Sequence, residues 1–263
     1  MTASLAGLTV VVTRPQHQAG PFIERATRAG AWCIALPAID IEPVEIGAAD
    51  RSRLAPDAHD WAIYTSANAV EASLEQLPKP VHCRIAAVGR ATARALESHG
   101  LSVDALPEGR SDSEGLLALP AFAAPQGQRV LIVRGVGGRE LLREHLQTRG
   151  AVVNVAEVYR RRTASAEPAV LSALASALTA DTRRIVVAVT SVDVLDALLG
   201  LLPGPLADRL RTCALLLPGE RVASAARERQ WSGPILVAPT AEDGSMFTAL
   251  EAHATNRGAG APP

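Results

Sequence analysis

Short apolar runs alternate with helical segments along most of the chain, and this alternation constrains the fold more than any other feature. The runs expected to form strands lie at 8–12, 61–65, 83–89, 129–133, 183–190 and 212–218. Segments with apolar residues at helical spacing lie between or after them, at 19–29, 67–76, 90–100, 192–199 and 220–229. Strands that alternate with helices form mainly parallel sheets with helices on both faces. The sequence therefore predicts an α/β fold.

The sequence also repeats itself in order, at an offset that grows slowly along the chain. Arg14 in "VVVTRP" matches Arg134 in "LIVRGV" at an offset of 120, and Thr65–Ser66 matches Thr190–Ser191 at an offset of 125. A third match, between "AAVGRATARAL" and "LLLPGERVASAA", has an offset of 130. Three matches in the same order indicate duplication of a small α/β unit. We therefore expect two similar lobes, each with a parallel sheet flanked by helices, and a cleft between the lobes.

Composition and charge exclude several classes of protein. The 26 basic and 27 acidic residues give a formal net charge of −1 without a basic stripe, so we expect no nucleic-acid partner. No apolar stretch is long enough for a membrane span, and the N-terminus lacks the pattern of a signal peptide. Cys33, Cys83 and Cys213 lie far apart, which predicts buried free thiols and a cytoplasmic location. The six histidines lack metal-ligand spacing, and we expect them at surface or helix positions.

Polar turns follow the predicted strands and open the predicted helices. They comprise Thr13–Arg14, Thr65–Ser66, Gly89–Thr92, Arg134–Arg139, Thr190–Ser191 and Gly219–Arg221. In open parallel sheets a ligand lies beyond the carboxyl ends of the strands, where these turns fall. The unpaired N–H groups and the dipole at each helix start favour a negatively charged ligand. The sequence therefore predicts an anion site formed by several turns.

The segment "RVLIVRGVGGREL" (129–141) is the glycine-rich member of this set. It lacks the spacing and the lysine of a P-loop, and as a dinucleotide motif it would have Glu140 in place of the third glycine. Two interpretations remain for this segment: a purely structural turn, or an anion cradle. Arg134 and Arg139 flank the glycines and favour the cradle.

The Thr-Ser pairs and one tyrosine each allow two interpretations. Thr65–Ser66 and Thr190–Ser191 have residue types that cap helix N-termini, and capping alone explains either pair. Their equivalent places in the two repeats also allow a role in ligand binding. Ser66 lacks the surroundings of an acyl nucleophile. Tyr159, in "VYRRR", is either a packing residue before a solvated basic run or a phenol that donates a proton to a leaving hydroxyl.

Taken together, these motifs resemble the uroporphyrinogen-III synthase family. The likeness rests on "VVVTRP" (10–15), "YTSANAVEA" (64–72), "AAVGRATARAL" (86–96), "SEGLL" (113–117), "VLIVRGVGGRELLREHLQTRGAVVNVAEVYRR" (130–161), "VTSVDVL" (189–195) and "GERVASAARERQW" (219–231). These segments span nearly the whole chain and keep the family order.

The resemblance implies an enzyme, a cyclising hydro-lyase of heme and tetrapyrrole biosynthesis that uses no cofactor and no metal. Its substrate would be hydroxymethylbilane, a linear tetrapyrrole with eight carboxylates. Loss of the terminal hydroxyl would give an azafulvene, attack by the substituted end of ring D would give a spiro-pyrrolenine, and the macrocycle would close with ring D inverted. Uncatalysed closure gives the isomer without inversion. The implied task of the enzyme is therefore to fold the bilane for spiro attack.

The resemblance also implies individual site residues. Tyr159 matches the family tyrosine proposed to assist loss of the hydroxyl. The implied substrate-binding residues are Arg14, Thr65, Ser66, Thr92, Arg134, Gly135, Gly138, Arg139, Thr190, Ser191 and Arg221. Gly219 departs from a bacterial Ser-x-Arg-Val-Ala motif, so the role of the serine hydroxyl falls to the glycine amide or is lost.

The family fold has two lobes joined by a two-stranded β-ladder. Mapped onto this sequence, residues 1–36 with 164–263 form one lobe, 43–156 form the other, and 37–42 with 157–163 form the ladder. The implied partners are the small-molecule substrate and, in a transient hand-over, hydroxymethylbilane synthase. We expect a monomer that binds neither nucleic acid nor membranes. The alternative function is a non-catalytic two-lobed module that binds an anionic small molecule.

Overall fold

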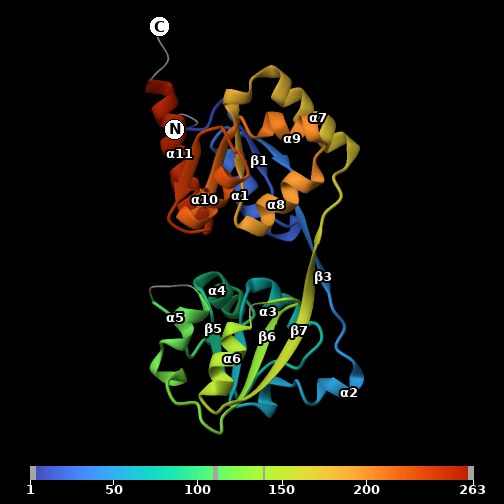
Figure 1. Ribbon diagram of the computed structural model, residues 1–263, viewed down its shortest axis with the longest axis vertical. Coiled ribbons are helices and arrows are strands. Elements are labelled where there is room, and N and C mark those ends of the chain that lie inside the picture. Colours follow the sequence, from blue (N-terminus) through green and yellow to red (C-terminus); the bar gives the residue numbers. More distant parts are fainter. Residues whose placement is uncertain (1–3, 109–111, 139, 260–263) are drawn as a thin grey trace. The chain divides into compact units, whose positions relative to one another are not determined.

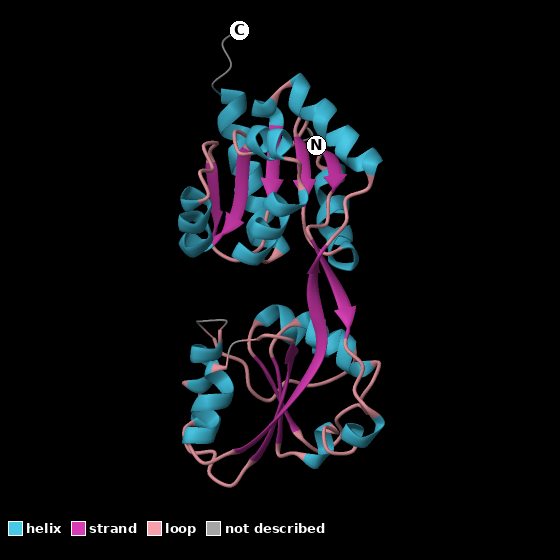
Figure 2. Ribbon diagram, turned by 45° about the vertical axis from the view of Figure 1, so that its right-hand side comes forward, coloured by secondary structure: helices cyan, strands magenta, loops and turns pink. Residues whose placement is uncertain are grey.

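The alternating pattern folds into two α/β units in the computed structural model, which describes residues 4–108, 112–138 and 140–259. Unit 1 comprises Met1–Asp40 and Arg162–Pro263, and unit 2 comprises Ile41–Arg161. Each unit contains one five-stranded sheet with helices on both faces (Figures 1 and 2). The predicted fold class is therefore confirmed.

Unit 1 has a sheet in which every neighbouring pair of strands is parallel, in the order β10-β9-β8-β1-β2. The strands are β1 (Thr9–Val12), β2 (Trp32–Ala35), β8 (Ile185–Ala188), β9 (Ala214–Pro218) and β10 (Ile235–Ala238). The helices are α1 (Gln16–Arg28), α7 (Pro168–Ala180), α8 (Val192–Leu201), α9 (Gly204–Leu210), α10 (Gly219–Glu228) and α11 (Asp243–Ala259). On one face, Val10 and Val12 share a core with Phe22 of α1 and Phe247 of α11. This core joins the first and last helices of the chain.

Unit 2 has the strand order β3-β7-β6-β4-β5. The strands are β3 (Ile39–Pro43), β4 (Trp61–Tyr64), β5 (Arg84–Ala87), β6 (Arg129–Gly135) and β7 (Val152–Thr163). The helices are α2 (Ala48–Arg51), α3 (Ala67–Leu74), α4 (Arg90–Ser98), α5 (Ser113–Leu117) and α6 (Leu141–Thr148). Successive side chains of β4 point to opposite faces of the sheet. Ala62 and Tyr64 pack in one core with α3 and α4. Trp61 and Ile63 pack in the other core with α5 and α6. Because both faces are covered, every residue of this strand is buried.

The repeated sequence segments occupy matching places in the two sheets. At offsets of 120 to 130, β1, β2, β8 and β9 of unit 1 correspond to β6, β7, β4 and β5 of unit 2. The two sheets order these strands identically, as β9-β8-β1-β2 and β5-β4-β6-β7. Each unit therefore combines the first part of one repeat with the second part of the other. This shared order supports the predicted duplication.

The chain crosses between the units within β3 and β7, which are paired with each other. Val44 N donates to Val158 O at 2.9 Å and Ala164 N donates to Ala38 O at 3.0 Å, so the two strands run antiparallel. β7 begins well before the expected segment 157–163, because its first half pairs in parallel with β6. One long strand thus belongs both to a parallel sheet and to an antiparallel pair.

Several helices lie outside the predicted segments, namely α7, α9, α11 and the short α2 and α5. The sequence of α7, "PAVLSALASALTA", is alanine-rich and apolar on most sides, so its helical periodicity is weak. Only Leu174 and Leu178, one turn apart, are fully buried in it. The helix is stabilised mainly by the packing of these two leucines against the rest of the unit. The sequence does not predict it, because its apolar residues are not confined to one face.

All three cysteines carry free thiols, as predicted, but their burial differs. Cys213 is buried, whereas Cys33 and Cys83 are only half-buried. Burial raises the pKa of the Cys213 thiol to about 12, and chiefly burial raises that of Cys83 to about 12. These two thiols therefore stay protonated and unreactive near neutral pH.

His59 corrects the expectation that the histidines occupy surface or helix positions. It is only 4% exposed and follows the short 3-10 turn Pro56–Ala58. Its Nδ1 lies 3.0 Å from Ala55 O, and its Nε2 lies 3.0 Å from Nδ2 of Asn154 on β7. An amide nitrogen can only donate and a carbonyl oxygen can only accept, so the geometry requires a neutral ring with its proton on Nδ1. Burial is the main cause that lowers the pKa of His59.

We predict that His59 makes the stability of the protein fall on acidification. The unfolded chain protonates this imidazole near its ordinary pKa of 6.5, whereas the folded protein disfavours the charged form. The His59 contribution is therefore present above about pH 6.5 and is lost as the pH falls below it. Urea unfolding from about pH 7.5 to about pH 5 should show a steeper loss of unfolding free energy for the wild type than for His59→Gln. Parallel curves for the two proteins would contradict this assignment.

Candidate functional site

The predicted site residues lie in both units. Tyr159 lies within β7, and the others lie at strand ends, in turns or in the first turns of helices. Unit 1 contains Arg14, Thr190, Ser191 and Arg221, and unit 2 contains Thr65, Ser66, Thr92, Arg134, Gly135, Gly138 and Tyr159. Arg139 lies outside the described residues. Within each unit, the site residues contact other residues of the same unit.

Thr65 and Ser66 terminate β4 and begin α3. The Thr65 backbone N–H and hydroxyl both donate to Val133 O, at 3.1 and 3.2 Å, which ties this turn to β6. Ser66 has an extended backbone and caps the helix, because its Oγ accepts from Ala69 N at 3.1 Å. Capping is therefore confirmed for Ser66, and its Oγ also has a second partner, the hydroxyl of Tyr159 at 3.0 Å.

Tyr159 is held in unit 2 by polar contacts at its hydroxyl and by close packing on its ring. Its side chain is only 2% exposed. Its oxygen lies 3.0 Å from Ser66 Oγ and accepts from Arg161 Nη2 at 3.2 Å, and the Arg161 guanidinium lies over the ring, 5.7 Å from the ring centre. The tyrosine is thus more than a simple packing residue. The three arginines that follow it are exposed, as predicted, and Arg161 among them contacts the phenol.

Arg161 is a residue of this site that the sequence analysis did not identify. The run Arg160–Arg161–Arg162 suggested solvated charge, but side chains two apart on a strand share a face. Arg161 therefore lies on the side of β7 that carries Tyr159. The period of two along the strand was the signal that could have identified it.

Gly135 makes room for the tyrosine ring. A Cβ atom at this position would lie 2.6 Å from Tyr159 Cζ and 2.9 Å from Cε2, closer than a real contact allows. The β6–β7 register shifts at the Arg134/Gly135 step, which sets Gly135 opposite Tyr159. Val136 N also donates to Tyr159 O at 2.8 Å, so the backbone holds this approach in place.

Arg134 stabilises the glycine turn from inside. It is 8% exposed, and its Nη2 contacts Glu140 Oε1 at 2.6 Å and Glu157 Oε1 at 3.1 Å. Its Nη1 donates to Gly138 O at 3.2 Å. The hydrogen bond from Arg134 is the main cause that lowers the pKa of the Glu140 carboxyl. The guanidinium is thus paired with carboxylates of the protein itself. Through its bond to Gly138 O, it also fixes the backbone of the turn.

Arg14 is engaged in the same way in unit 1. It forms an ion pair with Asp243 at the start of α11 and donates to Ala241 O at 3.1 Å. Its guanidinium lies 5.1 Å from the ring centre of Phe22. In both repeats the strand-end arginine therefore pairs with an acidic side chain.

The remaining predicted residues mark helix starts. Ser191 caps α8 by accepting from Val194 N at 3.2 Å, and Thr190 beside it is half-buried. Thr92 is buried in the first turn of α4. Arg221 is exposed in the first turn of α10, and no described residue pairs with it.

Gly219 has a positive φ of 69°, which explains its departure from the family serine. A glycine adopts this left-handed conformation without strain, whereas serine does so at a cost. The turn before α10 thus has a backbone shape that suits the residue present here.

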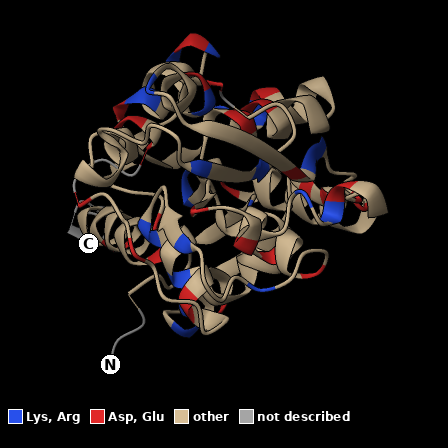
Figure 3. Cartoon of the chain, turned by 90° about the horizontal axis from the view of Figure 1, so that it is seen from below, with Lys and Arg blue, Asp and Glu red and all other residues tan. Residues whose placement is uncertain are grey.

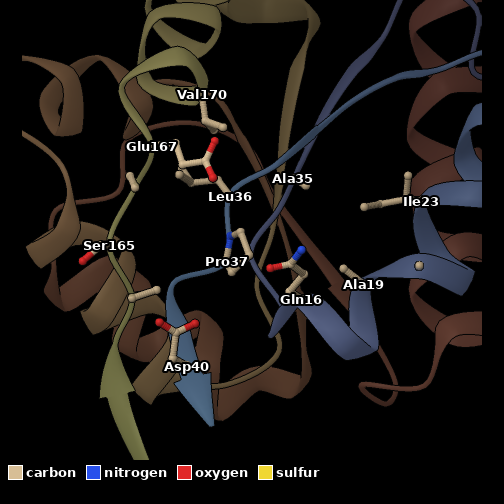
Figure 4. Close-up of a pocket in the computed structure, with 13 residues that line it drawn as sticks. Gln16, Ala19, Ile23, Ala35, Leu36, Pro37, Asp40, Ser165, Glu167 and Val170 are labelled. Atoms are coloured by element: carbon tan, nitrogen blue, oxygen red, sulfur yellow. The ribbon is translucent and has the colours of Figure 1, made fainter. Parts of the chain in front are cut away.

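A cavity of about 460 Å³ lies in unit 1 between the start of α1 and the segment that precedes α7 (Figure 4). Its polar lining comprises Gln16, Asp40, Ser165 and Glu167, and none of the predicted site residues lines it. Among its described lining residues are two carboxylates and no arginine or lysine. Such a cavity disfavours a polyanionic ligand, so we do not assign the anion site to it.

The charge distribution, possible metal ligands and possible membrane spans concern the described part of the chain. Basic and acidic residues are interspersed along the chain in the view of Figure 3. The described residues include no group of three or more histidine, cysteine, aspartate or glutamate side chains placed to hold a metal ion. None of the described helices combines the length and apolar character that crossing a bilayer requires.

Solved structures show the same fold. The chain matches a mutant uroporphyrinogen III synthase from Thermus thermophilus with a TM-score of 0.60 and 23% identity, covering 95% of this chain and 99% of that one. It matches the uroporphyrinogen-III synthetase of Helicobacter pylori with a TM-score of 0.61 and 17% identity, at the same coverage of both chains.

Sequence relatives show the family. A model of uroporphyrinogen-III synthase HemD matches residues 21–248. The uroporphyrinogen-III synthases of Salmonella typhimurium and Escherichia coli are 33% and 32% identical over 252 residues, which cover 93% of this chain and 100% of each relative. The chain therefore belongs to the uroporphyrinogen-III synthase family and is an enzyme, a lyase of porphyrin biosynthesis.

Proposed function

We propose that this chain converts hydroxymethylbilane into uroporphyrinogen III with loss of water and inversion of ring D. The observation that carries the proposal is the corner formed by Ser66, Gly135 and Tyr159, in a chain that matches two bacterial relatives over their whole length. The reaction needs an acid for the leaving hydroxyl and a rigid surface on which the bilane folds. This corner offers a held phenol beside a helix start.

The carboxylates of the bilane bind chiefly to backbone N–H groups at helix starts. Four helices are involved: α3, α4 and α8 follow the N-cap residues Ser66, Gly89 and Ser191, and α10 begins at Gly219. The first N–H groups and the dipole of each helix favour anions. Arg14 and Arg134 hold turns through their ion pairs. Arg221, exposed at α10, supplies a cation that no described carboxylate neutralises.

Catalysis proceeds by loss of the terminal hydroxyl to an azafulvene, spiro attack by ring D, fragmentation and reclosure. Tyr159 supplies the proton that lets the hydroxyl leave as water. Uncatalysed closure competes by joining the chain ends directly. The enzyme therefore gains selectivity by holding the bilane so that the substituted end of ring D is the nearer nucleophile.

The cellular setting follows from the chemistry of the substrate. Hydroxymethylbilane closes spontaneously, so a transient hand-over from hydroxymethylbilane synthase would protect it. The free thiols fit a reducing, cytoplasmic location. A monomer suffices for this proposal, because every residue it uses comes from one chain.

The function is tested with freshly made hydroxymethylbilane and separation of the isomers formed. We expect type III product in excess over the type I product of spontaneous closure. Formation of type I product alone would contradict the proposed synthase activity and would favour the alternative, a module that binds an anionic small molecule.

We predict that Tyr159→Phe slows formation of type III product on the order of a hundredfold without unfolding the protein, because it removes the acid and keeps the ring. Tyr64→Phe is the matched control, since Tyr64 lies in the core of unit 2, where burial raises its pKa above the usual range. The control should retain its rate of type III formation. An unchanged rate in Tyr159→Phe would remove this residue from the acid role.

We predict that Gly135→Ala displaces the Tyr159 ring. The added Cβ would overlap the ring, so the free energy of unfolding should fall by about 1–3 kcal/mol and the rate of type III formation should fall with it. Gly200→Ala in α8 is the control, because its Cβ meets nothing within 4 Å. We expect it to keep wild-type activity and to match or slightly exceed wild-type stability in urea unfolding. Equal stability and activity in Gly135→Ala would argue against the close approach.

A further inference from the structure

The hydroxyl of Tyr159 is poorly placed to reach a substrate directly. The side chain is 2% exposed, and its ring is packed against Gly135. Ser66, whose Oγ lies 3.0 Å from the phenol oxygen, is only half-buried. A proton from the buried Tyr159 phenol can therefore reach a bound substrate through the more exposed hydroxyl of Ser66.

The hydrogen-bond partners fix the direction of this chain of donors. Arg161 can only donate, so it fills one acceptor site of the phenol oxygen. Among the described residues, the only other partner of that oxygen is Ser66 Oγ. If Ser66 donated to Tyr159, the phenol proton would have no acceptor among the residues that the structure describes. Tyr159 therefore donates to Ser66, which also accepts from Ala69 N.

This arrangement releases the proton of Ser66. Its oxygen accepts two hydrogen bonds, one from the phenol and one from the first turn of α3. Its own O–H is then available to a group outside the protein core. The donors run in one direction, from Arg161 through Tyr159 and Ser66 to that group.

We propose that Ser66 is the immediate proton donor to the leaving hydroxyl, that Tyr159 replaces the proton Ser66 gives up, and that Arg161 is a positioning residue for the phenol. This inference rests on the proposed function, since it names how the acid of that reaction reaches its substrate. It makes Ser66 a catalytic residue as well as a helix cap.

The step balances without any further reactant. The bond between the terminal carbon of the bilane and its hydroxyl oxygen breaks, and that oxygen takes the Ser66 proton and leaves as water. Ser66 takes the phenol proton in the same step, which leaves a protonated azafulvene and a phenolate beside the Arg161 guanidinium. When the macrocycle closes, the ring carbon that forms the new bond loses its proton, and the phenolate recovers it through Ser66.

The other repeat supplies an internal comparison. Ser191 matches Ser66 and caps α8 in the same way, but Ile39 stands at the position of Tyr159 and Pro15 at that of Gly135. Unit 1 thus has the capping serine without the phenol or the glycine that admits it. The relay is specific to unit 2, so it is not a by-product of helix capping.

Substitutions at Ser66 test the relay in single-turnover assays of type III formation. Ser66→Gly removes the hydroxyl and remains acceptable at a helix N-cap, whereas Ser66→Thr keeps both the hydroxyl and the cap. We expect Ser66→Gly to slow the chemical step at least tenfold with little change in KM, and Ser66→Thr to recover most of the rate. Should Ser66→Gly not fold, Ser66→Asn takes its place, since it caps the helix without a hydroxyl. A wild-type rate in the folded variant without the hydroxyl overturns the proposal.

A double-mutant cycle tells a relay from two independent donors. In a relay, Ser66→Gly with Tyr159→Phe should be no slower than the slower single variant, because either change breaks the same path. Multiplication of the two single losses would overturn the relay, because each hydroxyl would then act by itself.

The role of Arg161 is tested against its neighbour on the strand. Arg161→Gln removes the charged donor to the phenol, and we expect a loss of about tenfold in kcat with KM unchanged, with partial recovery in Arg161→Lys. Arg160→Gln removes the same charge from the opposite face of β7 and should keep the wild-type kcat. Equal kcat values for the two glutamine variants would remove Arg161 from the relay.

The outcomes separate this inference from the proposed function. If the wild type forms only type I product, the function itself is wrong. If the wild type forms type III product and folded Ser66→Gly does so at the same rate, the function stands and the relay is wrong.

Discussion

The close approach of the Gly135 backbone to the Tyr159 ring is the constraint on which the unit 2 site depends. A register shift between β6 and β7 sets the two residues opposite each other, and any side chain at position 135 would overlap the ring. With the ring seated there, its hydroxyl lies beside Ser66, the residue that begins α3. One strand irregularity therefore aligns two strands and a helix start, which are the elements that the proposed chemistry uses.

Ion pairs within the protein define the role of the basic residues at the strand ends. Arg14 and Arg134 both pair with carboxylates, so their charge is largely balanced and their effect is to hold turns in shape. In the proposed function, a ligand with many carboxylates therefore depends on N–H groups at several helix starts, each of which contributes modestly. Binding spread over many weak donors suits a flexible polyanion better than one deep cationic pocket, and the cavity in unit 1, lined by Asp40 and Glu167, is unsuited to it.

The two repeats share their strand order, but the residues assigned to the proposed chemistry occur in only one of them. The matching strand orders β9-β8-β1-β2 and β5-β4-β6-β7 place a Thr-Ser turn at the same point of both sheets. Yet only the unit 2 copy combines the glycine and the tyrosine, because Pro15 and Ile39 occupy the equivalent positions in unit 1. The repeats thus share the strand order and the helix starts, while the residues assigned to the proposed chemistry differ between them.

The sequence by itself determined the α/β class, the duplicated frame, the family and the strand ends at which site residues fall, because apolar periodicity and repeat offsets are local properties of the chain. It could not predict α7, whose helical pattern is weak, nor the burial of His59, nor the membership of Arg161 in the tyrosine cluster. Tertiary structure alone decided that Arg134 binds Glu157, because these residues, 23 apart along the chain, become neighbours only when β6 and β7 pair. It also decided that the hydroxyls of Tyr159 and Ser66 lie 3.0 Å apart, because β7 and the start of α3 become neighbours only when the sheet of unit 2 forms.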